Sequence, residues 1–600
     1  MWGDKLILQS LVKYYEILAG DENSDIPMLG YSRVKVSYAL NISKDGELLE
    51  VIPLKVPSEN GKKMVPQSMV VPEQEKKSVG IKSNFLCGNS SYSLGIDNSG
   101  KLERTKSCFE AFKELHNKIL AAVNCDEAKA VIKFINSWDV QKALEHPALK
   151  DWIEELTAGA NMIFRLDGVG YIHQNEMIKK EWEKYKSNSE NGNMMQCLDC
   201  GQKAKVARLH PNIKGVRGAQ SVGASIVSFN AKAYESYGRE DDQGLNAPVS
   251  EYSTFAYTTV LNSMISDNAH KQYIGDTTIV FWAESKQRVY QDMASLFIDP
   301  SEIESEEKMK YVRDKSAIKE IKSIFEKIAN GQAIGGYSDY FDNNVKFYIL
   351  GLSPNAARLS IRFFIVNDFG VFISKITKHY QDLQIEKQFQ TETSIFSLWR
   401  LLNETVSPKS RDKDASPLLS GAVIRSILTG ASYPTALFNS IMVRVRAEHD
   451  INYYKAAIIK AYLLRNKNSN KFKEVLTVSL NEHSKNRAYV LGRLFAVLEK
   501  AQQDASEGKL NSTIKDRYFT SACATPASVF PILLRLSQHH ISKAEYGYTS
   551  DNNISQILNM LDIEQNPIPA HLSLDEQGVF VLGYYHQKNA LYRKNSEKEN

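Results

Sequence analysis

Cysteine is scarce in this sequence: only six of its 600 residues are cysteine, scattered at positions 87, 108, 125, 197, 200 and 523. Such sparse usage argues against a secreted disulfide framework and suits a reducing compartment. The sequence also lacks any apolar run near the roughly 18 residues that cross a membrane, and its N-terminal stretch lacks the pattern of a signal peptide. We therefore expect a cytoplasmic protein with no membrane contact.

Charge of one sign is not in large excess, because the net charge is only +4. This excludes a uniformly basic binder, so any affinity for nucleic acid must come from local basic patches. The motifs G-x-x-x-x-G-K-[ST], G-x-S-x-G and H-E-x-x-H are all absent. No set of residues supplies a nucleophile, a base and a group that orients them. We therefore expect a protein that is not an enzyme and needs no cofactor.

The chain is too long for one hydrophobic core, and its patterns change along its length. Alternation over residues 31–42, followed by Asp45-Gly46, predicts a hairpin, and residues 104–186 predict amphipathic helices. Apolar runs predict strands at 224–230, 277–283, 345–352 and 358–366, then a helix at 369–380. Beyond the polar segment 404–417 nearly every pattern is helical.

The expected fold class is α/β (mixed α+β) in an N-terminal body, followed by an all-α helical bundle. Residues 1–190 form the first α/β region, which ends in a polar linker at 186–193, and residues 195–403 form the second. Residues 404–417 form a linker, and residues 418–600 form the helical bundle.

A glycine-rich stretch, A-R-L-H-P-N-I-K-G-V-R-G-A-Q-S-V-G at 207–223, raises the question of a phosphate site. It fits neither a nucleoside-triphosphate loop nor a dinucleotide fingerprint, because no Lys-Ser or Lys-Thr follows its glycines and an expected strand, not a helix, comes next. Two interpretations stay open: a turn whose glycines take positive φ, or a loop that approaches a phosphate backbone. The residues of the second interpretation are Arg208, Lys214, Gly215, Arg217 and Gly218.

Metal-binding patterns are weak. Cys197 and Cys200 form one C-x-x-C pair with His210 downstream, but no second ligand pair follows, so we expect no metal there. His449-Asp450 suggests a metal-dependent phosphohydrolase, yet it fits better as part of the cap of a helix starting near Asn452. His539-His540 is interpreted as a packed or exposed helical pair.

Basic residues gather on predicted strands and in one loop. On a strand over 358–366 the alternation buries Leu359, Ile361 and Phe363 and exposes Arg358 and Arg362 on the other face. A solvated sheet face is the alternative interpretation. A similar basic face and a loop rich in lysine, glutamine and asparagine suit phosphate contact and base-edge recognition; their residues are Arg33, Lys35, Lys62, Lys63, Gln67, Lys82 and Asn84.

Several long segments resemble a known family. They include I-L-Q-S-L-V-K-Y-Y-E, A-R-L-H-P-N-I-K-G-V-R-G-A-Q, N-A-P-V-S-E-Y-S-T-F-A-Y-T-T-V-L-N, F-Y-I-L-G-L-S-P-N-A-A-R-L-S-I-R-F, G-R-L-F-A-V-L-E-K-A-Q and A-T-P-A-S-V-F-P-I-L-L-R-L-S-Q-H-H. Together, and in this order from the first helix to about residue 588, they resemble the large subunit of the type I-C CRISPR surveillance complex, Cascade.

The resemblance implies a non-catalytic subunit in antiviral defence. It would recognise the protospacer-adjacent motif, promote duplex opening and R-loop formation, and support recruitment of a helicase-nuclease. Its implied partners are the 5′ region of the guide crRNA, target double-stranded DNA, the repeated Cascade backbone subunits, the crRNA-processing subunit and the helicase-nuclease. The C-terminal bundle would then be small-subunit-like. The alternatives are a pure protein scaffold and a metal-dependent nuclease that uses His449 and Asp450.

Overall fold

The computed structural model describes residues 6–22, 24–58, 63–74, 80–188, 193–229, 231–235, 243–298, 323, 327, 341–393, 396–411, 415–506, 510–561 and 568–596. The chain divides into two compact units. Unit 1 comprises Met1–Pro211 and Val227–Ser263, and unit 2 comprises Asn212–Ile226 and Met264–Asn600. No helix among the described residues is long and apolar enough to span a membrane.

Unit 1 is built on a mixed sheet with the strand order β3-β2-β7-β6, to which β8 adds beside β7. Its strands are β2 (Tyr38–Ile42), β3 (Leu48–Pro53), β6 (Cys87–Asn89), β7 (Asn161–Leu166) and β8 (Gly170–Tyr171). The sequence-predicted hairpin is confirmed, because β2 and β3 pair antiparallel around Gly46, whose φ is +84°. Both faces of β2 are buried, so this strand lies at the centre of the unit.

Helices pack on this sheet through a core that includes Tyr38, Phe112 and Phe164. The helices of unit 1 are α1 (Ile7–Ala19), α2 (Ser90–Ser93), α3 (Leu102–Leu120), α4 (Asp126–Ser137), α5 (Ile153–Thr157), α6 (Glu176–Asn188) and most of α7 (Glu251–Ser266). Lys186 at the start of the expected 186–193 linker is still part of α6, and residues 189–192 lie outside the described residues.

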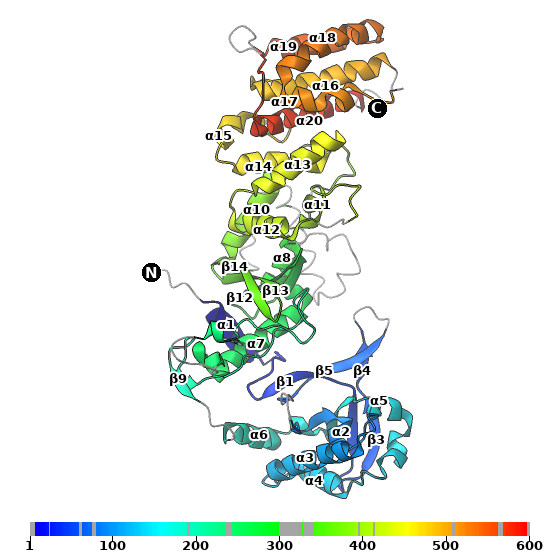
Figure 1. Ribbon diagram of the computed structural model, residues 1–600, viewed down its shortest axis with the longest axis vertical. Coiled ribbons are helices and arrows are strands. Elements are labelled where there is room, and N and C mark those ends of the chain that lie inside the picture. Colours follow the sequence, from blue (N-terminus) through cyan, green and yellow to red (C-terminus); the bar gives the residue numbers. More distant parts are fainter. Residues whose placement is uncertain are drawn as a thin grey trace. The chain divides into compact units, whose positions relative to one another are not determined.

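A second sheet of unit 1 has the order β1-β5-β4, with β1 (Tyr31–Val36), β4 (Lys55–Pro57) and β5 (Met64–Pro72). The alternating stretch 31–42 is therefore not one strand: it breaks at Ser37 and feeds two sheets. Figure 1 shows β1, β5 and β4 in blue. A small hairpin of β9 (Met194–Gln196) and β10 (Lys203–Lys205) completes the strands of this unit.

Two sequence-based predictions of elements are wrong. The region 104–186 is not purely helical, because β7 lies within it and pairs parallel with β2. The run 224–230 does not form a strand: Ala224 and Ser225 make only isolated bridges, to Ile213 and Arg358.

Unit 2 begins with a four-stranded antiparallel sheet in the order β11-β12-β13-β14. The strands are β11 (Lys271–Ile274), β12 (Thr277–Ala283), β13 (Lys346–Asn355) and β14 (Arg358–Asp368), and α8 (Val289–Ile298) and α10 (Phe369–Leu383) belong to the same core. Phe347, Phe369 and Phe372 contact one another there at ring distances of 4.9 to 5.8 Å. The predicted strands at 277–283, 345–352 and 358–366 and the helix at 369–380 are confirmed.

Beyond α10 the regular elements of the described residues are all helices, which confirms the mixed fold class with an all-α C-terminal region. Its helices are α11 (Leu398–Asn403), α12 (Pro417–Thr429), α13 (Thr435–Glu448), α14 (Tyr453–Arg465), α15 (Ser469–Phe472), α16 (Arg487–Ala505), α17 (Ile514–Ala524), α18 (Pro526–Lys543), α19 (Gly547–Leu558) and α20 (Leu574–Ser596). Residues 404–411, 415 and 416 of the expected 404–417 linker lie between α11 and α12, Pro417 begins α12, and residues 412–414 lie outside the described residues.

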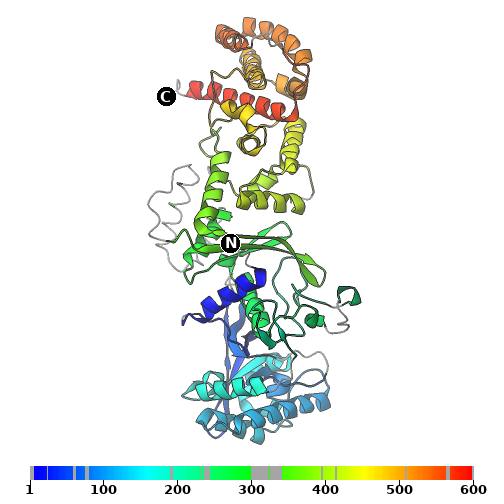
Figure 2. The same cartoon turned by 90° about the vertical axis from the view of Figure 1, so that its left-hand side faces the viewer.

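The longest of these helices, α20, lies inside the bundle. Figure 2 shows α20, in red, between the orange helices and the yellow ones. It packs against α16 so closely that a Cβ added at Gly492 would overlap the backbone carbonyl of Phe580. The contact is reciprocal, because a Cβ at Gly583 on α20 would overlap the carbonyl of Tyr489 on α16. Only glycine permits this approach of the two backbones.

Candidate nucleic-acid interface

One basic face lies on the β1-β5-β4 sheet of unit 1. Cross-strand partners point to the same side of a sheet, and β1 pairs Arg33 with Val70 and Lys35 with Ser68. Arg33 and Lys35 are both exposed on this side, as expected. The Arg33 guanidinium pairs with Asp25 at 2.8 Å, whereas Lys35 makes no ion pair with any described residue.

Gln67 does not share that face. It pairs with Val36, so its side chain belongs to the opposite side of the sheet, which carries the buried Met69 and Val71. Lys63 is exposed where the β4–β5 hairpin closes, and its carbonyl accepts a hydrogen bond from Ser58 N at 2.7 Å. Lys62 lies outside the described residues.

The two predicted residues after β5 differ in exposure. Lys82 is exposed, but Asn84 is only 8% exposed and its amide donates to Gln74 Oε1 at 2.5 Å. Contact between Asn84 and a base would therefore require this internal hydrogen bond to break. Its role in recognition stays a prediction.

A lysine that the sequence did not single out, Lys55, pairs with Pro66 on β5 and so belongs to the side of the sheet that carries Lys35. Its ammonium binds Glu155 at 2.5 Å and lies 5.4 Å from the ring centre of Tyr38. The hydrogen bond with Glu155 raises the pKa of Lys55. These contacts anchor β4 to the body of the unit, so we assign Lys55 a structural role.

Residues 213–224, which lie in unit 2 and contain all three glycines of the stretch, form a loop whose two ends pair with each other. Ile213 and Ala224 exchange both backbone hydrogen bonds at 2.9 Å. Gly215, Gly218 and Gly223 have φ values of +79°, +78° and +88°, so the turn interpretation is confirmed for these glycines. A Cβ at Gly223 would lie 2.7 Å from the Ile213 carbonyl oxygen, which fixes glycine there.

This glycine loop, residues 213–224, also leaves polar groups exposed. Lys214, Gly215, Arg217 and Gly218 are all exposed. Among the described residues, no acceptor takes the N–H of Gly215 or Gly218, and no partner binds the Arg217 guanidinium. Free backbone N–H groups and a guanidinium in one short loop are donors of the kind that bind phosphate. The remaining member of the predicted set, Arg208, is exposed in unit 1.

The loop meets the β13–β14 hairpin end, which brings together two sets of residues that the sequence predicted separately. Ser225 N donates to Ala357 O at 3.1 Å, and Leu359 N donates to Ser225 O at 3.0 Å. Arg358 therefore lies at the strand start that adjoins the loop. The hydroxyl of Thr278 on β12 accepts from Arg217 N at 3.0 Å and fixes the loop to the sheet.

The pairing of β14 with β13 shifts its register at Arg362. Phe363 pairs with Gly351 on one side of it, and Ile361 pairs with Leu352 on the other. The shift turns Ile361 outward to 42% exposure, so the prediction that Ile361 is buried is wrong, while Leu359 and Phe363 are buried as predicted. The Arg362 guanidinium pairs with Asp276 at 3.0 Å.

A cavity of about 630 Å³ is lined by Arg362 and by a second arginine, Arg425 of α12. The Arg425 guanidinium is exposed and pairs with no described residue. The two arginines are far apart in the sequence, so no spacing pattern could have paired them. Because Asp276 lines the same cavity and pairs with Arg362, the net positive charge there comes from Arg425.

The C-x-x-C pair lies at the turn of the β9–β10 hairpin. Burial raises the pKa of the Cys197 thiol, but hydrogen bonds from the backbone of Cys200, Ser250 and Asp199 outweigh it and lower that pKa overall. His210 instead shares a hydrogen bond of 2.6 Å with the Tyr257 hydroxyl. Among the described residues no group of three or more His, Cys, Asp or Glu side chains is placed to hold a metal ion.

The His449-Asp450 dipeptide has a different role from the expected cap. His449 ends α13 in the left-handed conformation, with φ +52°, and Asn452 caps α14 by accepting from Lys455 N at 2.8 Å. Asp450 accepts from the Lys455 ammonium at 3.2 Å. These contacts stabilise the junction of two helices. His539 and His540 lie partly exposed on α18, as predicted.

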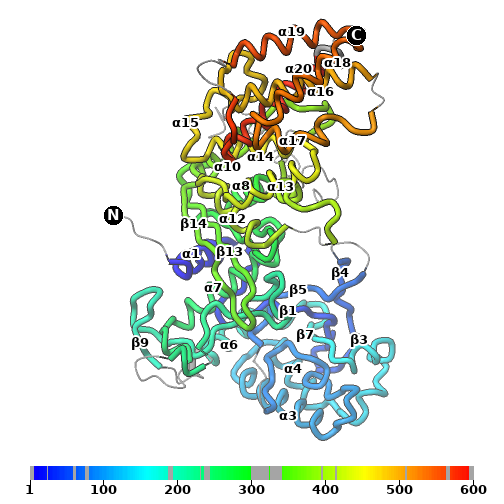
Figure 3. The backbone as a smooth tube through the Cα atoms, turned by 45° about the horizontal axis from the view of Figure 1, so that its top comes forward, coloured from blue at the N-terminus to red at the C-terminus, as the bar shows by residue number. Residues whose placement is uncertain are grey.

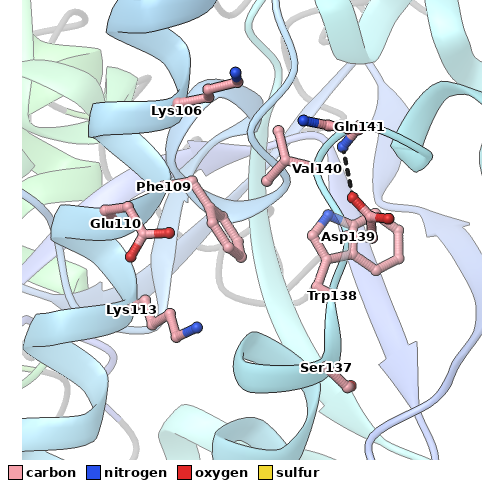
Figure 4. A pocket seen from close by; sticks show the side chains of 9 residues that line it. All are labelled: Lys106, Phe109, Glu110, Lys113, Ser137, Trp138, Asp139, Val140 and Gln141. Atoms are coloured by element: carbon pink, nitrogen blue, oxygen red, sulfur yellow. Dashed lines mark hydrogen bonds between the residues drawn. The ribbon is translucent and has the colours of Figure 1, made fainter.

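A further hollow of about 490 Å³ lies between α3 and the segment after α4. Figure 4 shows Lys106, Glu110 and Lys113 on α3, opposite Asp139. Charges of both signs line it, so it lacks the single positive sign that a phosphate contact favours.

The comparisons with known proteins identify the family. A family model described as CRISPR-associated protein (Cas_Csd1) matches residues 11–592, and the chain therefore belongs to this family. Membership supports a Cascade-type CRISPR-associated protein, and thus a component of a multi-subunit CRISPR assembly. No curated protein matches the sequence.

Proposed function

We propose that this chain is the large, non-catalytic subunit of a type I-C CRISPR surveillance complex. It recognises the protospacer-adjacent motif on duplex DNA, promotes duplex opening and R-loop formation, and supports recruitment of a helicase-nuclease. In RNA-guided systems base pairing reads the target, while protein reads a short duplex motif and the backbone. The family match over residues 11–592 supports the class, and the type I-C-like segments support the subtype.

The observation that carries the proposal at the level of residues is the glycine loop. Its free N–H groups at Gly215 and Gly218 and the exposed Arg217 form a donor set without an internal acceptor among the described residues. Arg358 adjoins it on β14. This set contacts a phosphate backbone and carries no base specificity, because phosphate contacts position a protein and base contacts give specificity.

We assign recognition of the motif to the β1-β5-β4 sheet of unit 1. Lys35 lies on β1 and Lys63 directly precedes β5, and both are exposed and without an ion pair to a described residue. Lysine ammonium groups bind phosphates and the acceptor edge of guanine in the major groove. A two-stranded ribbon such as β4–β5 fits that groove, so this hairpin is the element that enters the duplex.

A charge-reversal experiment tests this assignment. The variant Lys35→Glu/Lys63→Glu is assembled into the guide complex, and binding to matched and motif-scrambled duplexes is measured at one fixed salt concentration. We expect the affinity for the matched duplex to fall about tenfold or more, because two phosphate or base contacts become repulsive. The preference for the matched motif shrinks with it.

The matched control is Lys101→Glu/Lys129→Glu, which changes the charge equally on two exposed lysines of unit 1. The control retains the affinity and preference of the unmodified chain. If both variants bind alike, the hairpin does not read DNA, and the chain acts in the complex as a pure scaffold.

A further inference from the structure

The turn between β9 and β10 places two thiols next to each other. Cys197 N donates to Gln202 O at 2.8 Å, Gly201 N donates to Cys197 O at 2.9 Å, and Gly201 has φ +72°. The bond from Gly201 N to Cys197 O joins residues four apart, as in a single helical turn, and in such a turn residues three apart have Cα atoms about 5 Å apart. A disulfide spans a Cα separation of roughly 4.4–6.8 Å. The turn therefore brings Cys197 and Cys200 within disulfide range.

The two sulfurs differ in their surroundings. Cys197 is 1% exposed, and Ser250 N donates to its sulfur at 3.2 Å, whereas Cys200 is exposed. The neighbouring Cys197 thiol raises the pKa of the Cys200 thiol. A disulfide needs only this pair, while a tetrahedral metal site needs two more ligands, and the described residues supply no third one. Figure 3 shows where this hairpin lies, at the label β9.

We propose that Cys197 and Cys200 form a reversible dithiol–disulfide site that low-molecular-weight disulfides such as oxidised glutathione oxidise. The exposed Cys200 sulfur attacks the glutathione disulfide, whose S–S bond breaks, and the leaving glutathione thiolate takes up the Cys200 proton. The Cys197 sulfur then attacks the Cys200 sulfur of this mixed disulfide, and the second glutathione leaves with the Cys197 proton. Two thiols are oxidised and one glutathione disulfide is reduced to two thiols.

Oxidation at this turn has a structural consequence for unit 1. Asp199, between the two cysteines, accepts from Gln9 Nε2 of α1 through its carbonyl at 2.8 Å and from Ser253 Oγ of α7 at 2.7 Å. A disulfide draws the Cys197 sulfur toward Cys200, so the hydrogen bond that this sulfur accepts from Ser250 N weakens on oxidation. The turn that joins α1 to the start of α7 then loosens, and amide exchange near Ser250 speeds up a few-fold.

The remaining cysteines provide internal controls. Cys87, Cys108 and Cys523 are buried, and Cys125 is partly exposed, its sulfur accepting from Ala128 N at the start of α4. All four are free thiols without a cysteine three residues away. We expect them to stay reduced under conditions that oxidise the pair.

The test is a redox titration of the full chain in glutathione buffers, with rapid alkylation and mass spectrometry of the peptides. The expected result is a loss of two hydrogen atoms confined to the peptide that contains Cys197 and Cys200, reversed by reduced glutathione and abolished by Cys200→Ser but not by Cys125→Ser. The proposal is overturned if both thiols are alkylated as completely as Cys125 across the whole series. It is equally overturned if one zinc ion co-purifies and shields the pair until a chelator removes it.

Discussion

Replacing Gly492 by alanine tests the close packing of α16 on α20. The added methyl would overlap the Phe580 carbonyl oxygen and lie 2.9 Å from Tyr584 N. Both obstacles are backbone, so no side-chain rotation relieves them and the helix axes must separate. Overpacking of this kind costs about 3 kcal/mol or more. The helix preference of alanine over glycine offsets about 1 kcal/mol, which leaves a net loss of about 2 kcal/mol.

Hydrogen exchange measures this loss locally, in the full chain. A net loss of about 2 kcal/mol speeds exchange about 30-fold, and we expect this in peptides of α16 and α20. The matched control is Gly421→Ala in α12, also within a helix, where an added Cβ meets nothing within 4 Å. It should slow local exchange or leave it unchanged, because only the helix preference acts there. Equal exchange in the unmodified and Gly492→Ala chains would refute the packing argument.

Three further predictions follow from single sites. Gly223→Ala introduces left-handed strain of about 1–2 kcal/mol and also a contact of 2.7 Å with the Ile213 carbonyl oxygen. It should lower the melting temperature more than Gly100→Ala, which has the same kind of strain but meets nothing within 4 Å; equal decreases in melting temperature would contradict this. Burial lowers the pKa of His586 to about 3, so its contribution to stability is complete above the unfolded pKa of about 6.5 and is lost as pH falls below it. Between about pH 7.5 and about pH 5 this protonation costs about 2 kcal/mol of unfolding free energy, and urea unfolding of His586→Gln should lack that decrease. An unchanged pH dependence would count against it. Arg217→Gln should reduce the slope of log affinity against log salt of the guide complex for its nucleic acid by about 0.9, whereas Arg104→Gln, at an exposed residue of α3, should leave the slope unchanged. If both variants have the same slope, Arg217 does not contact a phosphate.

The pattern of apolar residues along the sequence was enough to predict several elements. The strands β12, β13 and β14 and the C-terminal helices follow directly from their patterns. β7 was missed because N-M-I-F-R-L is a short apolar run, and such a run does not distinguish a buried strand from a helix segment. Its pairing with β2, more than 100 positions away, and with β6 makes it a strand.

The candidate site shows the same limit. The positive φ of the loop glycines was predictable from residue type, but the run after them makes only bridges, because Ser225 meets a hairpin end from another part of the chain. The outward turn of Ile361 depends on a register shift that alternation does not encode. Likewise the shared cavity of Arg362 and Arg425 exists only after folding.

The most direct test of the central claim is target-duplex binding by the reconstituted guide complex, with and without this chain, at fixed salt. Matched and motif-scrambled duplexes are compared, because the non-specific electrostatic contribution is common to both. The account predicts that binding of the matched duplex requires this chain and that the preference for the motif disappears without it. If binding and preference both survive its removal, the motif is read elsewhere and the proposed function is wrong.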